Sequence, residues 1–156
     1  MNYSALYGVG ASKLARETGM TTKEAKALLE AFWSRNWAIK SVSDSVRTRE
    51  LFDSMWLQNP VSKFWYSLRS DKDRFSTLNQ GTGVFCFDTW VALCRKNGIK
   101  AIGQFHDEVI ALVEAGQEGE TERLMHWAAT KLNEKVQLNV PLGTDVQFGK
   151  TYGEIH

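Results

Sequence analysis

The stretch from residue 104 to residue 113, QFHDEVIALV, constrains the fold of this chain more than any other. Two runs of mostly apolar residues flank the polar step His106-Asp107-Glu108, a pattern typical of two strands joined by a tight turn. At the tip of such a hairpin the carboxylates of Asp107 and Glu108 repel each other unless a cation or a reaction uses them. The stretch therefore predicts an antiparallel hairpin and poses the question of what the two acids bind.

The size and composition of the chain predict one ordinary globular domain. Its 156 residues are long enough to bury a core, and 43% hydrophobic with 24% charged residues is far from a disordered composition. No apolar run approaches about 18 residues, so we expect no membrane span. The opening MNYSALYGVG lacks a basic stretch followed by an apolar core, so we expect no signal peptide and a cytoplasmic location.

The two cysteines are expected to be buried thiols. Cys86 and Cys94 lie in one predicted helix, where eight residues place them about 12 Å apart. A disulfide needs Cα atoms within roughly 7 Å. We therefore expect no bond between them.

Charge is distributed unevenly along the chain. Residues 1–100 carry 15 Lys and Arg against 9 Asp and Glu, whereas residues 101–156 carry 4 against 9. A basic part followed by an acidic part suits a protein that holds a polyanion with one region and a cation with the other. A chance asymmetry of a solvated surface explains the same numbers.

Periodicity and end signals predict an α+β fold. Gly19 is a typical helix end, and Thr21 with Glu24 predicts a capping box. The pattern predicts helices over residues 12–18, 22–36, 38–52, 71–96 and 119–136. It predicts two aromatic-rich strands within residues 55–67 about a turn at Asn59-Pro60, then strands over residues 100–105, 109–113 and 144–149. The expected architecture is helices plus a small antiparallel sheet carrying an acidic β-hairpin.

The chemistry of the acidic turn favours a magnesium site. Carboxylate oxygens are ligands for Mg²⁺ or Mn²⁺, and Mg²⁺ sites typically use one or two carboxylates together with substrate phosphates. In two-metal phosphoryl transfer such ions stabilise the attacking and leaving oxygens. That reaction needs at least one further carboxylate from elsewhere in the fold. By itself, the His-Asp-Glu triplet is also typical of a solvated turn.

Three motifs in order carry a family resemblance. The segment QFHDEVIALV, preceded by TLNQGTG and, earlier, by NYSALYGVG, resembles the polymerase domain of family A DNA polymerases, which include bacterial DNA polymerase I and many phage replicases. The resemblance extends to the closing VPLGTDVQFGKTYGEIH. It implies partial fingers over residues 1–70 and a palm region over residues 71–156 of a right-hand polymerase. The small size and the segment NPVSKFWYSLR suggest a bacteriophage enzyme, which would act in the host cytoplasm.

The resemblance implies roles for residues near the acidic turn and in the long helix. Asp107 matches the family's metal-binding aspartate, Glu108 its less stringent carboxylate partner, and His106 the histidine near the primer terminus. Gln80 matches the glutamine that reaches the minor groove of the primer–template, where an amide meets positions common to all correct pairs. Ser76 stands where the family has a DNA-contacting asparagine.

Further roles follow for the first residues and for two glycines. Tyr3 matches the aromatic that packs against the incoming nucleotide, and tyrosine there is associated with tolerance of dideoxynucleotides. Tyr7, followed by Gly8, matches the tyrosine beside the template base. Gly81 and Gly83 would let the helix and the duplex approach closely. Without the other motifs, Tyr3 and Tyr7 would be an ordinary i, i+4 aromatic pair.

The family pattern is only partly present. A lysine and an arginine that grip the triphosphate, and a second metal-binding aspartate, belong to places before Met1. The resemblance therefore implies a C-terminal fragment or split subunit of a DNA-directed DNA polymerase. It would bind primer–template DNA, deoxynucleoside triphosphates and Mg²⁺, and would need a second polypeptide for activity and be inactive alone.

Two other interpretations stay open. One is a non-catalytic nucleic-acid-binding remnant of a polymerase, which would bind DNA without a divalent metal. The other is a metal-dependent phosphohydrolase with His106 and Asp107 as its ligand pair. A hydrolase needs further histidines, and only His126 and His156 remain, neither with ligand spacing.

Overall fold

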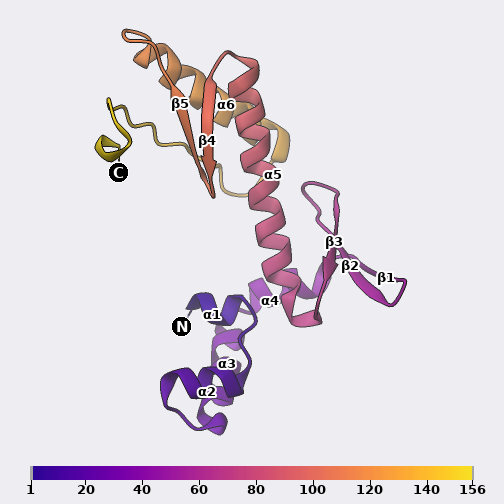
Figure 1. Cartoon of the computed structure of the whole chain (residues 1–156). Helices are drawn as coiled ribbons and strands as arrows, with labels where there is room; N and C mark the ends of the chain where they lie inside the picture. Colours follow the sequence, from indigo (N-terminus) through magenta and orange to yellow (C-terminus); the bar gives the residue numbers. More distant parts are fainter. Residues whose placement is uncertain (1, 156) are drawn as a thin grey trace. The chain divides into compact units, whose positions relative to one another are not determined.

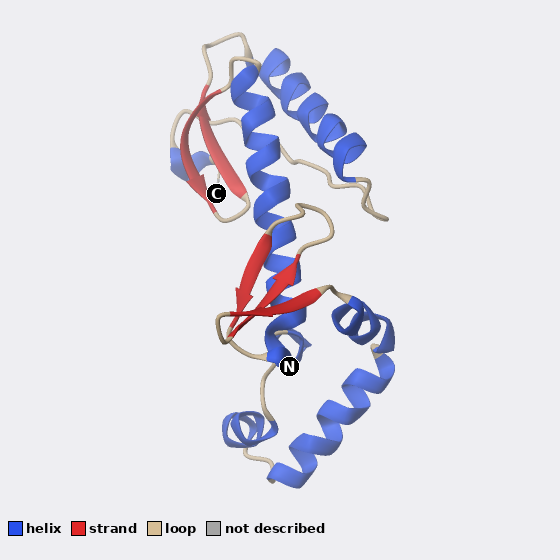
Figure 2. Cartoon of the chain, turned by 90° about the vertical axis from the view of Figure 1, so that its right-hand side faces the viewer, coloured by secondary structure: helices blue, strands red, loops and turns tan. Residues whose placement is uncertain are grey.

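The structure is a computed structural model that describes residues 2–155, with side chains described from residue 4 onward. The chain divides into two compact units, Met1–Thr82 and Gly83–His156. Figure 1 shows the order of the elements along the chain. The sheets are a three-stranded antiparallel one, β1-β2-β3, and a two-stranded antiparallel one, β4-β5 (Figure 2). The α+β expectation is confirmed, with two small sheets among the described residues where one was predicted.

The first unit begins with four helices. They are α1 (Asn2–Leu6), α2 (Ala11–Thr18), α3 (Thr22–Arg35) and α4 (Trp37–Ser45). The capping box is present, because the Thr21 hydroxyl accepts from the Glu24 amide and the Glu24 carboxylate accepts from the Thr21 amide. Leu14, Ala15 and Ala25 form a small buried cluster that joins α2 to α3.

The predicted helix over residues 38–52 is wrong beyond Ser45. Val46 leaves the helical conformation, with φ −65° and ψ 134°, and β1 (Thr48–Leu51) follows. β1 pairs with β2 (Ser54–Gln58) across a turn in which Phe52 and Asp53 both have positive φ. Residues 48–51 form a strand because they pair with β2, although the apolar residues of this segment recur with helical spacing. Phe-Asp is not the Asn-Gly or Asp-Gly pair that usually marks such a turn, so the hairpin left no clear signal.

The strands predicted around Asn59-Pro60 are confirmed as β2 and β3 (Trp65–Leu68). Asn59 is fully buried, and its side chain holds the connecting turn. Its Oδ1 accepts from the amides of Val61 and Ser62 at 2.8 and 3.0 Å. Its Nδ2 donates to the Leu78 carbonyl at 3.1 Å and to the Thr82 hydroxyl at 2.8 Å. One amide therefore joins the turn to the following helix.

The long predicted helix is present as a short 3-10 turn, η1 (Asp71–Asp73), followed by α5 (Arg74–Lys96). Gly81 lies on α5 where Tyr66 of β3 packs against it, and a Cβ there would approach the Tyr66 ring to 2.9 Å. Gly83, by contrast, has open space around its Cα. The close approach at Gly81 thus serves packing between β3 and α5.

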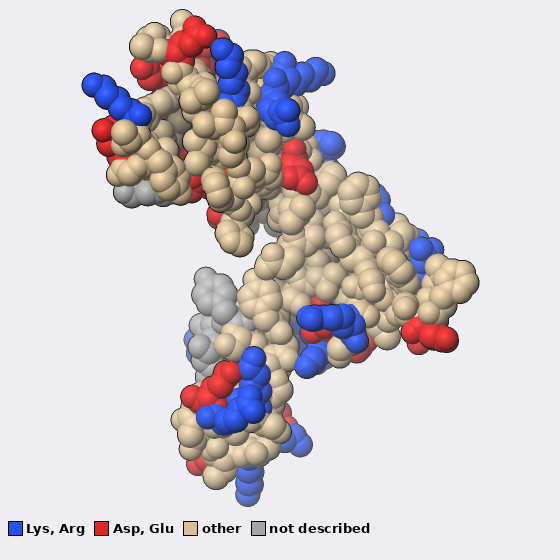
Figure 3. Space-filling model, viewed as in Figure 1, with Lys and Arg blue, Asp and Glu red and all other residues tan. Residues whose placement is uncertain are grey.

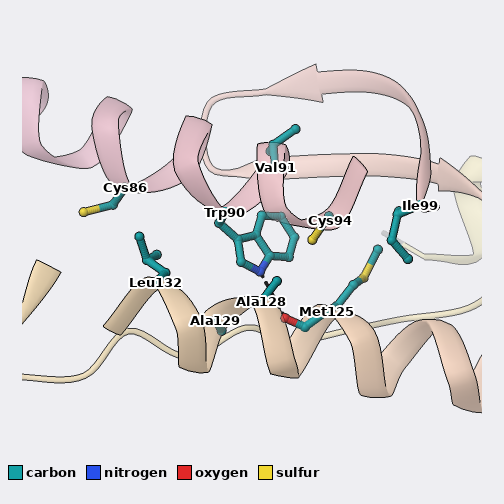
Figure 4. Close-up of a cluster of buried hydrophobic side chains, with 9 residues drawn as sticks. All are labelled: Cys86, Trp90, Val91, Cys94, Ile99, Met125, Ala128, Ala129 and Leu132. Carbon is teal, nitrogen blue, oxygen red and sulfur yellow. Dashed lines mark hydrogen bonds between the residues drawn. The ribbon is translucent and has the colours of Figure 1, made fainter. Parts of the chain in front are cut away.

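The second unit contains the rest of α5, β4 (Lys100–Phe105), β5 (Glu108–Leu112), α6 (Glu118–Val136) and η2 (Tyr152–Glu154). Figure 4 shows its core, in which α5 and α6 face each other. The Trp90 indole N–H donates to the Met125 carbonyl at 3.1 Å. Cys86 and Cys94 are free and buried, as predicted, and burial raises the pKa of the Cys94 thiol to about 11.

The closing strand predicted over residues 144–149 is wrong. This segment has no strand conformation, and Asp145 is exposed. Just before it, the backbone at Leu142 is held by the Asn133 side chain of α6, with two bonds of 2.8 Å. The backbone N–H and C=O of Leu142 are therefore satisfied by a side chain, and the alternating pattern alone did not bring residues 144–149 to a sheet edge. No helix of the described residues has the length and apolar character needed to cross a membrane.

Candidate functional site

The acidic turn joins β4 to β5. Phe105 and Glu108 form the last pair of the ladder, so His106 and Asp107 make a two-residue turn. His106 has φ +47°, a left-handed conformation that histidine and asparagine tolerate better than most residues. His106 and Asp107 are exposed, and Glu108 is half-buried as the first residue of β5. The hairpin prediction is confirmed, with Glu108 on the strand and not in the turn.

The hairpin is fixed on α5 and on the core of its unit. The Gln104 amide of β4 donates to the Asp88 carboxylate of α5 at 3.1 Å. Val109 and Ala111 of β5 pack against the buried cluster. The β4 ladder shifts register between Ala101 and Gly103, a local irregularity of the kind that re-aims a strand. These contacts hold the turn from both strands.

Asp107 and Glu108 also line a cavity of about 1170 Å³ in the second unit. Its walls come from α5, β5, α6 and the segment from Leu142 to Ile155. The described residues contain no group of three or more His, Cys, Asp or Glu side chains that could hold a metal ion. The two carboxylates are therefore the oxygen donors that this chain offers at the turn. Mg²⁺ sites in general use one or two carboxylates together with water and phosphate.

A second group of predicted residues comes together in the first unit. The Gln80 amide of α5 donates to the Tyr7 hydroxyl at 2.9 Å, joining positions 73 residues apart. Gly8 has φ +76°, which favours glycine, and a Cβ there would lie 3.1 Å from the Lys72 carbonyl oxygen. Gly8 thus ends the first helical segment and brings Tyr7 to the start of α5. The resemblance predicts that Tyr7 contacts the nucleotide and that Gln80 contacts DNA, and in the structure the two side chains are hydrogen-bonded to each other.

The remaining predicted residues have less defined surroundings. Ser76 is half-buried in the first turn of α5, and its hydroxyl donates to the Asp73 carbonyl at 3.0 Å. Tyr3 lies in α1, but its side chain is outside the described residues. Sequence reasoning missed Asp88 and Lys72, because no pattern marks a contact between residues so far apart in the chain.

The comparisons with known proteins agree with the resemblance. No protein-family model matches the chain. Three curated relatives are similar over nearly its whole length: DNA polymerase I of Lactococcus lactis subsp. cremoris, 25% identical over 171 aligned residues; of Streptococcus pneumoniae, 23% over 171; and of Borreliella burgdorferi, 22% over 174. The alignments cover 99%, 99% and 100% of this chain but 19% of each relative.

A solved structure decides the fold. The POL domain of Pol1 from M. smegmatis, in complex with DNA primer-template and dNTP, matches 99% of this chain with a TM-score of 0.73 and 22% identity. This chain has the fold of part of a DNA polymerase I polymerase domain. The match covers 30% of that structure. The three relatives are bacterial proteins, and a bacteriophage origin stays a prediction.

Proposed function

We propose that this chain forms the C-terminal part of the polymerase domain of a DNA-directed DNA polymerase of family A. The observation that carries the proposal is the β4–β5 hairpin, which holds Asp107 and Glu108 at and beside an exposed turn. The similarity to DNA polymerase I over nearly the whole chain and the polymerase-domain fold support it. The chain spans about a fifth of the length of the relatives, so the activity of the whole enzyme is part of the proposal.

In this proposal Asp107 is the principal metal ligand and Glu108 supports it. Asp107 is exposed at the turn, where a carboxylate meets a phosphate-bound ion without displacing protein atoms. Glu108 begins a strand, where side chains alternate between faces, and so approaches the site from a different angle. A bound Mg²⁺ would stabilise charge on the reacting phosphate oxygens. The further carboxylate that two-metal chemistry needs would come from outside these 156 residues.

The contact between Tyr7 and Gln80 suggests how the nucleotide and the primer–template are sensed together. Gln80 uses one amide hydrogen on Tyr7 and keeps its carbonyl oxygen and second amide hydrogen for a base edge. We propose that Tyr7 and Gly8 lie beside the nascent pair, with Tyr3 against the incoming nucleotide. Ser76 and His106 complete the contacts to DNA in this proposal.

The assembled enzyme would combine this chain with a second polypeptide that carries the rest of the polymerase domain, and would act in the cytoplasm. A non-catalytic nucleic-acid-binding remnant is the second candidate. It is favoured by the excess of Lys and Arg over Asp and Glu in residues 1–100 and by the further carboxylate that two-metal chemistry would need from elsewhere. Metal-dependent primer extension separates the two, because a remnant would bind DNA without a divalent metal and would not extend a primer.

Primer extension tests the proposal directly. A primed template, deoxynucleoside triphosphates and Mg²⁺ are incubated with the chain alone and with the polypeptide encoded directly upstream. We expect extension only in the second mixture, because each missing electrostatic element is typically worth several kcal/mol in a transition state. Robust extension by the chain alone would refute the need for a partner. Metal-independent DNA binding without extension in either mixture would favour the remnant.

A further inference from the structure

The three-stranded sheet of the first unit has one face made of exposed and half-buried side chains. Residues directly opposite in the ladder share a face, and faces alternate along each strand. Leu57, Tyr66 and Leu68 therefore share the inner face, where Leu57 and Leu68 are buried and Tyr66 packs on α5. The register places on the outer face Arg49, Trp56, Gln58, Trp65 and Ser67, with Arg47 just before the edge strand β1. We call these six residues the outer platform.

Two arginines of the outer platform stack on one tryptophan. The Arg49 guanidinium lies 4.0 Å from the centre of the Trp65 ring, and that of Arg47 lies 5.4 Å from it. Arg47 also donates to the Gln58 side chain at 3.1 Å. Both arginines are exposed, and neither forms an ion pair with any residue from 4 to 155. Stacking thus fixes two planar cations whose charge no carboxylate neutralises.

The second tryptophan of the outer platform carries an unused donor. The Trp56 indole nitrogen is buried and is the one buried side-chain polar atom that lacks a hydrogen-bond partner in the part of the chain described. Trp56 stands directly opposite Arg49 and Ser67 in the ladder. A buried N–H without an acceptor costs free energy.

The charge of the surroundings suits an anionic ligand. The first unit carries 12 Lys and Arg against 8 Asp and Glu. Glu50, the acidic residue of β1, stands opposite Met55 and so belongs to the inner-face set of the ladder. Figure 3 shows the region of β1–β3 as a mainly uncharged surface with Lys or Arg side chains at its margin and with Asp or Glu side chains at the tip of the β1–β2 hairpin. Phosphate is therefore attracted here without competition from a carboxylate on the same face.

We propose that the outer platform binds single-stranded nucleic acid. Arg47 and Arg49 would contact successive phosphates, and a base would stack on the arginine–tryptophan layer or on Trp65 itself. Sequence-tolerant single-strand binding generally combines a basic surface with aromatic rings, and bases also stack on guanidinium planes. The inference concerns the first unit alone and does not rest on the acidic turn.

Fluorescence anisotropy of a labelled 20-nucleotide oligothymidine tests the proposal. The assay uses the full 156-residue chain in EDTA, so that no metal at the acidic turn contributes. The test variants are Arg47→Gln with Arg49→Gln, and separately Trp65→Leu, each checked for folding by circular dichroism. The matched control is Arg16→Gln with Arg35→Gln, which removes the same charge from exposed arginines of helices α2 and α3.

We expect the Arg47/Arg49 variant to lose about tenfold in affinity and to lower the slope of log K against log salt by about 1.4, the value for two single-strand phosphate contacts. Trp65→Leu should lose about tenfold on oligothymidine and little on an abasic strand of equal length, because it removes stacking. If Trp65→Leu does not fold, the abasic strand with the unaltered chain gives the same test and should bind about tenfold more weakly. Equal losses in the control variant, or equal binding of the abasic strand, would each overturn the proposal.

Discussion

Removal of the Asn59 side chain should destabilise the first unit more than any other single polar change. Asn59→Ala deletes four hydrogen bonds from a fully buried side chain. The Leu78 carbonyl keeps the Thr82 hydroxyl as a partner at 2.8 Å, so that acceptor stays satisfied. The buried Ser62 amide loses its acceptor, and an unsatisfied buried group costs about 1–3 kcal/mol.

The lost bonds and the stranded amide together predict a loss of about 3 kcal/mol in the free energy of unfolding. For a chain of this size that lowers Tm by roughly 6–12 °C. Urea denaturation followed by circular dichroism measures the free energy, and hydrogen exchange reports local protection of residues 59–64. The matched control is Asn79→Ala on the exposed side of α5, which should change stability by about 0.5 kcal/mol or less. A loss below about 0.5 kcal/mol for Asn59→Ala, with protection of the turn unchanged, would refute the reasoning.

Three further predictions concern packing and ionisation. Gly83→Ala should raise the free energy of unfolding by up to about 1 kcal/mol in urea denaturation, whereas Gly81→Ala in the same helix should lower it, because the new methyl group meets the Tyr66 ring. Cys94, with its pKa raised to about 11 by burial, should resist iodoacetamide at pH 8 in the native chain and react in guanidinium, as mass spectrometry would show; equal rates would contradict its burial. Hydrogen bonds from the capping threonine lower the pKa of Glu24 below 4.5. The ionised carboxylate therefore contributes its full stabilisation above pH 4.5, and this stabilisation is lost as the pH falls through the lowered pKa. Glu24→Gln should flatten the dependence of the free energy of unfolding on pH in this acid range, and an unchanged dependence would contradict the capping role.

Local signals predicted much of the fold. The capping box, the strands around Asn59-Pro60 and the hairpin at the acidic turn each depend on neighbouring residues, and each is present. The errors arose where contacts outside the segment decide its conformation. Residues 48–51 join a sheet through pairing with β2 across a turn that lacks the usual turn residues, and Leu142, just before the wrongly predicted strand, is held by a side chain of α6.

The candidate site was predictable to a similar degree. The positions of His106, Asp107 and Glu108 in one hairpin follow from the sequence pattern. The bond between Tyr7 and Gln80 does not, because it depends on the tertiary placement of α5 beside the first residues. The roles of all these residues in polymerisation stay predictions that rest on the resemblance.

A test of nucleotide selection addresses Tyr3. In the complex with the upstream polypeptide, Tyr3→Phe should raise discrimination against dideoxynucleotides and leave ordinary incorporation nearly unchanged. The tyrosine hydroxyl can take the place of a sugar hydroxyl that the dideoxy substrate lacks, and phenylalanine cannot. Identical chain-termination patterns for the two proteins would rule out this placement of Tyr3.

The most direct test of the central claim is Asp107→Asn in that complex, with primer extension and duplex binding measured side by side. The account predicts that extension is abolished and that binding is largely kept, because affinity for DNA comes mainly from Lys and Arg contacts to phosphate. Glu108→Gln should be milder, and Glu122→Gln, an exposed acid of α6 in the same unit, should extend primers normally. Near-normal extension by Asp107→Asn, or a loss explained entirely by lost DNA binding, would contradict the assignment of the acidic turn as a metal site.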